Sequence, residues 1–199
     1  VIIGGSKSAS VDNTSITMNS GTVEILIGGG YGVIGSNKTI SGDTAKVTGI
    51  TTIAMTGGTD SNCLIGGGLY YNKTNKVNIS LSGTASVGIP NNWVICGGFE
   101  SGCTAGTAYD EFAKSSNTVA EATLNIDGGT YSLIGIGGTD GNKGYVQKAT
   151  AIVNNATITG GVYGNGSNGR SNIVSGTFNN CVMYNIFVGV LQSVGDGRH

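Results

Sequence analysis

The feature that most constrains this chain is a short apolar run that ends in consecutive glycines and returns along the sequence. It stands at residues 26–30 (Leu-Ile-Gly-Gly-Gly) and again, unchanged, at 64–68, with weaker copies at 95–98 and 133–138. The chain itself opens on a copy at residues 2–5. Such a run predicts one strand followed by a bend that side chains would obstruct. Its recurrence predicts a repeat protein.

A second recurring unit precedes most of the bends, an alternating strand that ends in Ser-Gly or Gly-Gly. Apolar and polar residues alternate in it, which predicts one buried face and one wet face. Its copies are residues 16–22, 53–59, 79–84, 124–130, 156–162 and 173–177. The glycines that mark the copies stand 37, 25, 46, 32 and 15 residues apart: Gly21, Gly58, Gly83, Gly129, Gly161 and Gly176.

This irregular spacing excludes the fixed periods of helical repeats and of hexapeptide left-handed β-helices. It favours a solenoid whose strands stay constant while the loops between them vary, with each coil stacked in parallel on the one before. Parallel crossovers are overwhelmingly right-handed. We therefore predict an all-β, right-handed parallel β-helix (β-solenoid) of about five or six irregular coils. It would form a single domain, residues 1–199, with a long insert loop at 99–121.

Alignment of the copies on the glycine bend predicts which side chains face the core. We expect two inward apolar columns, one just before the bend and one two residues earlier: Ile3, Ile27, Ile65, Cys96, Ile136 and Val188, then Val1, Ile25, Cys63, Val94, Ile134 and Ile186. The intervening position should face outward, yet apart from Gly135 it is apolar too: Ile2, Leu26, Leu64, Ile95 and Phe187. Strands that are apolar on both faces are usually covered on both. The outward column therefore predicts an interface with a neighbouring subunit, another domain or the chain's own long loops.

These units, of the form x-Ile-x-(Met/Leu/Ile)-x-(Ser/Gly)-Gly-Thr followed by Leu-Ile-Gly-Gly-Gly, resemble the right-handed β-helix repeats of bacterial surface proteins and phage tailspikes. The resemblance covers residues 1 to about 190. It implies an elongated extracellular scaffold, often trimeric in the phage members. Related folds also carry pectate-lyase-type and glycosidase activities, but no residue of their catalytic motifs can be matched to this sequence.

Composition excludes several classes of protein. Thirty-seven glycines against one proline exclude collagen. A net charge of −1 gives no sign of a nucleic-acid partner. The sequence contains no run of eighteen apolar residues, so no membrane span is predicted. Low charge with many Thr, Ser, Asn and Gly residues is typical of β-rich chains that work outside cells. We expect an extracellular, cell-surface or virion-surface location, and a mature product or fragment of a longer protein because no signal peptide is seen.

Four cysteines follow no zinc-binding pattern, and we expect no metal and no cofactor. Asp60 and Asp140 both follow Gly-Gly-Thr, but on different units of the repeat, so a shared site is not expected. The cysteines read best as small apolar residues. A disulfide between Cys96 and Cys103 is the alternative.

Two groups of residues could carry function. In the insert, Glu100, Asp110 and Glu111 could form the acid/base pair of a polysaccharide lyase or glycosidase, or could simply decorate a solvated loop. Aromatic residues that follow the bends could stack on sugar rings, or could cap the core or cover the outward column: Tyr31, Tyr70, Tyr71 and Phe99. Trp93, after the turn signal Pro-Asn-Asn, is expected to pack at a coil corner.

The sequence therefore favours an extracellular structural and binding role, as an adhesin, filament or tail-fibre component that recognises carbohydrate. The rival is a carbohydrate-active enzyme of the β-helix class. We expect a homo-oligomer or packing against another domain, with a polysaccharide as a possible partner. The apolar run at 181–191 could be a final coil whose open edge pairs end to end with another copy.

Overall fold

The computed structural model describes residues 1–7, 9–31, 45–69, 72–89, 92–98, 118–138, 145–165 and 170–190. The described residues form strands and contain no helix, and every strand pairing among them is parallel. The strands are β1 (Ile2–Ile3), β2 (Thr14–Met18), β3 (Thr22–Ile27), β4 (Ala45–Met55), β5 (Thr59–Ile65), β6 (Asn72–Val87), β7 (Trp93–Ile95), β8 (Thr118–Gly135), β9 (Tyr145–Asn154), β10 (Thr157–Asn165), β11 (Arg170–Asn179), β12 (Val182–Met183) and β13 (Ile186–Val190). The prediction of an all-β chain with parallel strands is confirmed.

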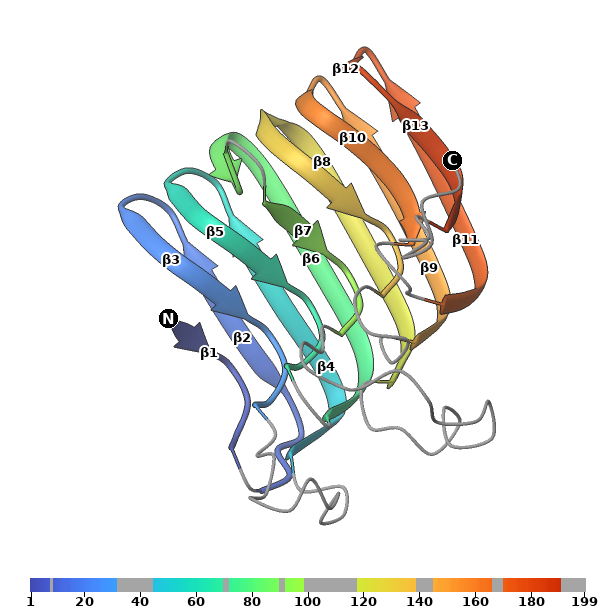
Figure 1. Cartoon of the computed structure of the whole chain (residues 1–199). Helices are drawn as coiled ribbons and strands as arrows, with labels where there is room; N and C mark the ends of the chain where they lie inside the picture. The colour runs from blue at the N-terminus through green and yellow to red at the C-terminus, as the bar shows by residue number, and fades with distance from the viewer. Residues whose placement is uncertain are drawn as a thin grey trace, which may run out of the picture.

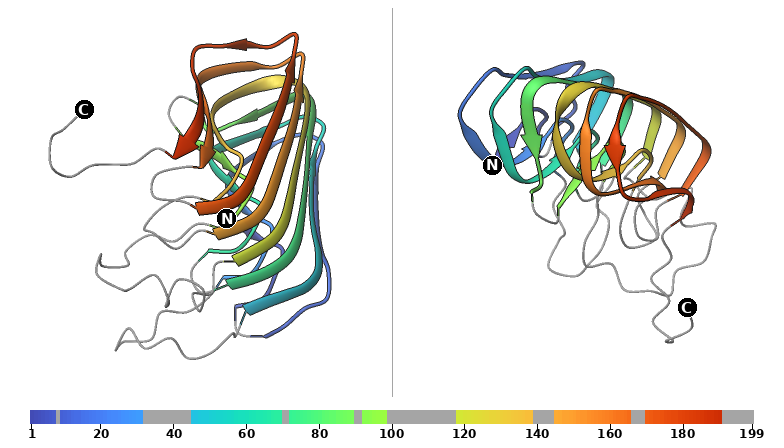
Figure 2. Two further views of the ribbon diagram at one scale, coloured as in Figure 1. Left: turned by 90° about the vertical axis from the view of Figure 1, so that its right-hand side faces the viewer. Right: turned by 90° about the horizontal axis from the view of Figure 1, so that it is seen from above.

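The strands form two layers (Figure 1). In the long layer the pairing order is β2, β4, β6, β8, β9 and β11. In the short layer it is β1, β3, β5, β7, the end of β8, β10 and β13. We call one long strand with the short segments that follow it a pass. Successive passes lie side by side along the molecule, and Figure 2 shows them from two further directions.

A sharp corner joins the long strand of each pass to its short segments. Gly21 and Gly58 take φ of 89° and 86° there, in the left-handed region that side chains disfavour. The last two passes use Asn155 (φ 55°) and Asn180 (φ 50°) instead, and asparagine is among the residues that tolerate this region best. The amide Nδ2 of Asn180 donates to Oδ1 of Asn155 at 2.8 Å, so the corner also links neighbouring passes. This corner explains the recurring Ser-Gly and Gly-Gly pairs.

The core fills the space between the layers. Its columns run from pass to pass, for example Ile53, Ile79 and Leu124 in the long layer and Leu64, Val94 and Ile134 in the short layer. These six side chains are 0–1% exposed. Each contributes about 1.5–3 kcal/mol by burial, and no single pass could enclose them alone.

The predicted assignment of the columns in the short layer is partly wrong. Leu26 and Leu64, predicted to face outward, are fully buried in the main core, and Ile2 pairs in register with Leu26. Ile95 and Phe187 do stand in the outward column, as predicted. That column also holds residues predicted to face inward: Ile3, Ile27 and Ile65. Val1, Ile25 and Cys63 likewise lie outside the main core, whereas Cys96, Ile136, Val94 and Ile134 lie in it.

The physical reason is a one-residue offset at the bend. Gly28 and Gly66 occupy the inward position that Cys96 and Ile136 fill in later passes, as the backbone hydrogen bonds across the bend show. A Cβ on Gly66 would lie 2.6 Å from Val77 Cγ1, and one on Gly28 would collide with Thr51 Cγ2. In the register of the long layer, Ala122 and Ala149 take the place of these β-branched residues in later passes. Smaller residues in the long layer therefore leave room for Cys96 and Ile136.

The chain itself covers the outward apolar column in its first passes. Ile27, Ile65 and Ile95 are only 1%, 3% and 0% exposed, and they form a second cluster separate from the main core. Partly buried residues pack against this cluster: Ile25, Tyr31, Cys63, Leu69 and Trp93. Residues of the strands and bends therefore cover this part of the column. A cover by a neighbouring subunit, another domain or the long loops stays a prediction.

Candidate binding faces

Of the residues predicted to bind a ligand or to catalyse a reaction, the described part of the chain contains Tyr31. Tyr31 is half-buried, pairs with Leu69 in a parallel bridge and packs on the second cluster, as a covering residue would. The other aromatic candidates, Tyr70, Tyr71 and Phe99, lie outside the described residues, as do the carboxylates Glu100, Asp110 and Glu111. Their roles stay predictions.

A different aromatic row lies on the outer face of the short layer. Trp93 and Tyr163 have ring centroids 5.2 Å apart at 49°, and Tyr163 and Phe187 are stacked at 4.9 Å and 5°. Gly135 shares the outward column with Tyr163 and Phe187. Because Tyr163 stacks on Phe187, it turns one face to that ring instead of to a ligand. Each pair is worth about 0.5–1.5 kcal/mol beyond its burial, so the row binds passes together. The sequence signal was an aromatic residue close to the bend in the last two copies, Tyr163 directly before Gly164 and Phe187 two residues before Gly189.

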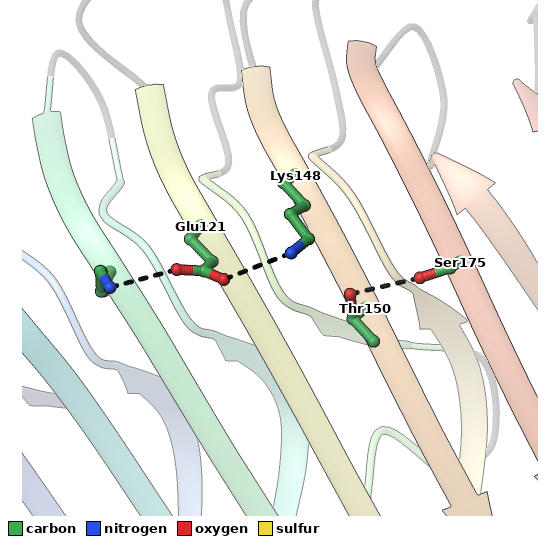
Figure 3. Close-up of polar contacts among 5 residues, drawn as sticks. Glu121, Lys148, Thr150 and Ser175 are labelled. Atoms are coloured by element: carbon green, nitrogen blue, oxygen red, sulfur yellow. Dashed lines mark hydrogen bonds and ion pairs between the residues drawn. The ribbon is translucent and has the colours of Figure 1, made fainter.

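The outer face of the long layer carries short polar side chains in columns. Neighbouring members lie about 4.8 Å apart, and Ser175 donates a 3.2 Å hydrogen bond to Thr150 Oγ1 (Figure 3). We call two adjacent outward columns of this surface the polar face. Its members are uncharged, and all but Ala54 and Ile152 carry a hydroxyl or an amide: Ser15, Thr17, Thr52, Ala54, Asn78, Ser80, Thr123, Asn125, Thr150, Ile152, Ser175 and Thr177. The exposed Asp127 stands on the same face beyond Asn125. The column Ser15, Thr52, Asn78, Thr123, Thr150 and Ser175 can donate and accept hydrogen bonds at every step. Ala54 and Ile152 interrupt the second column.

A row of alternating charge borders the polar face. Glu121 lies between Lys76, at 3.2 Å, and Lys148, at 3.8 Å, on three neighbouring strands (Figure 3). The three side chains are 40–55% exposed, and pairs this exposed contribute at most about 1 kcal/mol each. Beside them lies an open hollow of about 360 Å³, lined in part by Gln147 and Asn172. The row therefore links three neighbouring strands only weakly.

One carboxylate is buried in the described core. Asp60 is 0% exposed and accepts the N–H of Leu26 on Oδ2 and the N–H of Asn62 on Oδ1, both at 3.1 Å. Burial raises the pKa of Asp60 to about 6, although the backbone donors lower it. It stands at the register shift between Val23 and Ile25, so it satisfies backbone donors where the ladder is interrupted. Asp60 is a structural acid, and Asp140 lies outside the described residues.

The cysteines of the described regions, Cys63, Cys96 and Cys181, are free thiols, so Cys96 takes no part in the disulfide considered above. Burial, and then the nearby Asp60 charge, raises the pKa of Cys63 to about 12, and burial raises that of Cys96 further. Such thiols are unreactive. Within the described part of the chain, no three His, Cys, Asp or Glu residues cluster as a metal site.

No helix within the described ranges has the length and apolarity needed to cross a membrane. Comparison of the chain with protein-family models, with curated proteins and with solved structures finds no match. The faces described above therefore carry the functional argument alone.

Proposed function

We propose that this chain is a right-handed parallel β-solenoid that serves as an extracellular structural scaffold and binds a neutral carbohydrate polymer on its polar face. The observation that carries the proposal is the polar face itself, in which one uncharged column presents a hydroxyl or an amide on each of six paired strands.

The scaffold part is supported by the way the passes stack. The long strands pair in register over as many as ten residue pairs, as between β6 and β8, and the same columns are buried in pass after pass. An architecture of this kind gains length by adding passes, each of which contacts only its neighbours. Right-handed crossovers are the expected connection between parallel strands.

The carbohydrate part is supported by chemistry. A polymer with repeating hydroxyls can meet donors and acceptors that recur at a fixed step along a flat sheet. The absence of charge on the polar face and the net charge of −1 favour a neutral ligand over a polyanion. The same features suit a cell-surface or virion-surface location.

The test compares two double variants in a binding assay on a panel of neutral and acidic polysaccharides. Thr123→Ala with Asn125→Ala removes two polar groups from the middle of the polar face. Ser61→Ala with Thr159→Ala removes two exposed hydroxyls elsewhere. We expect the first variant to bind a neutral polysaccharide at least about tenfold more weakly, and the second to bind like the parent. Equal losses in both variants, or no binding by the parent, would refute the proposal.

The enzymatic alternative is tested in the same panel. Chain shortening by the parent protein, measured as new reducing or unsaturated ends, is compared with that of the variant Glu100→Ala, Asp110→Ala and Glu111→Ala. A scaffold produces no new ends. Turnover that the triple variant abolishes would replace the scaffold proposal by the enzyme.

A further inference from the structure

Two adjoining hollows lie near the start of the long strands, beside the polar face but not on it. One, of about 370 Å³, crosses from β4 to β9, and the other, of about 360 Å³, crosses from β6 to β11. They share two lining residues, Ala120 and Gln147. Together they extend over five neighbouring strands, which is about 19 Å at 4.8 Å a step. We call the two hollows the basic trough.

An irregularity in the long strands opens this space. Successive side chains of a regular strand point to opposite faces, but here two successive residues reach the outer surface between buried neighbours. These pairs are Asn75 and Lys76 on β6, Ala120 and Glu121 on β8, and Gln147 and Lys148 on β9. Ala120 stands level with the longer Asn75 and Gln147. Its single methyl group therefore leaves the room that both hollows share.

The basic trough gathers positive charge. Of the five lysines among the described residues, four line it: Lys46, Lys73, Lys76 and Lys148. Two carboxylates of the described residues lie at the trough. Glu121 lies between Lys76 and Lys148 (Figure 3), and Asp12 accepts a hydrogen bond from Thr48 at the edge. Within the described part of the chain, the trough is therefore more positive than negative, although the net charge of the chain is −1.

Two of the lysines stand directly opposite each other. Lys46 on β4 and Lys73 on β6 are partners in register, so their backbones lie about 4.8 Å apart. Like charges in directly opposite positions destabilise a sheet, and an anion that binds both lysines relieves the repulsion. An ammonium group has three N–H donors, so a lysine that already has one partner can still donate to an anion.

The neutral groups of the trough indicate what kind of anion fits. Amides and a tyrosine line it beside the lysines: Asn75, Tyr145, Gln147 and Asn172. Lysine forms charge-assisted hydrogen bonds with acidic groups, amides pair with hydroxyls, and an aromatic ring with a polar tip packs on a sugar ring. An acidic polysaccharide offers acidic groups, hydroxyls and sugar rings together. The step of about 4.8 Å between strands is also close to the length of one sugar residue in an extended chain.

We propose that the basic trough binds an acidic polysaccharide that lies across the long strands, with its acidic groups on the lysines and its hydroxyls on the amides. A hollow lined mainly by one sign of charge raises the local concentration of the opposite charge. The trough and the polar face are different surfaces of the same layer. The acidic polymer proposed here and the neutral polymer proposed for the polar face can therefore fail independently.

The test measures the affinity of the protein for carboxymethylcellulose and for hydroxyethylcellulose, which has the same backbone without the charge. Lys46→Gln with Lys73→Gln removes two positive charges from the trough. Ala120→Glu fills the shared space and adds a negative charge. Lys7→Gln and Ser20→Glu are the matched controls, because they make the same kinds of change at exposed positions outside the trough. A thermal melt checks that each variant folds, and either trough variant suffices if the other does not.

We expect both trough variants to bind carboxymethylcellulose at least about tenfold more weakly than the parent, and both controls to bind it like the parent. Added salt should weaken this binding in the parent, because it screens exposed charges. The affinity for hydroxyethylcellulose should be the same in all the proteins. The proposal is overturned if the parent does not bind carboxymethylcellulose, or if the controls lose as much affinity as the trough variants. Tighter binding of double-stranded DNA through the same lysines would also overturn it, in favour of a nucleic acid.

Discussion

Asp60 and Tyr131 place polar atoms in a column whose other members are apolar. The column runs Val23, Asp60, Val87, Tyr131, Ile158 and Met183. The carboxylate has backbone donors, whereas the buried Tyr131 hydroxyl has no hydrogen-bond partner within the described part of the chain. The two residues should therefore respond to substitution in different ways.

Stability should fall as Asp60 ionises. Its pKa is about 6 in the folded protein against 3.8 as the ordinary value, so the folded state holds the proton more tightly than the unfolded state. Below pH ~4, Asp60 makes its full contribution to the free energy of unfolding. Between pH ~4 and pH ~6 that contribution falls, by about 3 kcal/mol in all. Denaturant melts of the parent and of Asp60→Asn from pH 4 to 7 measure it. The difference between the two should change by about that amount, and a difference that ignores pH would show that Asp60 is not buried.

Removal of the Tyr131 hydroxyl should stabilise the protein. Burial raises the pKa of Tyr131, and a buried unsatisfied hydroxyl costs about 1–3 kcal/mol. Tyr131→Phe keeps the ring, so we expect the free energy of unfolding to rise by about 1 kcal/mol in denaturant titration. Tyr131→Leu, which also removes ring volume, should lower it by about 2 kcal/mol or more. Destabilisation by Tyr131→Phe would mean that the hydroxyl has a partner.

At the scale of the element, the sequence predicted the glycine bend correctly, but it assigned several side chains before the bend to the wrong face. Its recurrence predicted strands, parallel stacking and the close approach of backbone. It could not predict that Gly66 lies in the same inward position as Cys96, because glycine has no side chain to show its facing. That facing depends on the size of residues in the other layer, such as Val77 and Ala122, which are distant in sequence. The aromatic row was not predicted, because Trp93 and Tyr163 hold different positions relative to the bend. An alignment of the copies on the bend therefore does not bring the two residues together.

The bend can be tested by adding one methyl group. A Cβ on Gly66 would lie 2.5 Å from the Cys96 carbonyl oxygen and 2.6 Å from Val77 Cγ1. Gly66→Ala should therefore cost about 1–3 kcal/mol of stability through overpacking. Gly161→Ala is the matched control, because its Cβ would meet nothing nearer than 3.4 Å, and it should be neutral or slightly stabilising. Equal effects of the two substitutions on the thermal midpoint would contradict the account of the bend.

At the scale of the whole molecule, one outward column runs through the six long strands of the described residues. Ser15, Thr52, Asn78, Thr123, Thr150 and Ser175 are successive partners in one outward column. The polar face and the buried columns of the long layer both follow from this register. The ligand and the assembly state depend on surfaces that the repeat leaves free to vary, which is why the sequence constrained them less than the strands.

The distance between Ser15 and Ser175 tests that register most directly. Cysteines at these positions carry spin labels in a chain whose four native cysteines are replaced by alanine, diluted with unlabelled protein and measured by pulsed dipolar spectroscopy. Five steps of about 4.8 Å predict a narrow distribution near 24 Å between the two backbones. A pair at Ser15 and Thr150, one step shorter, should lie about 5 Å closer. A broad distribution, or two pairs whose order is reversed, would contradict the parallel in-register stack.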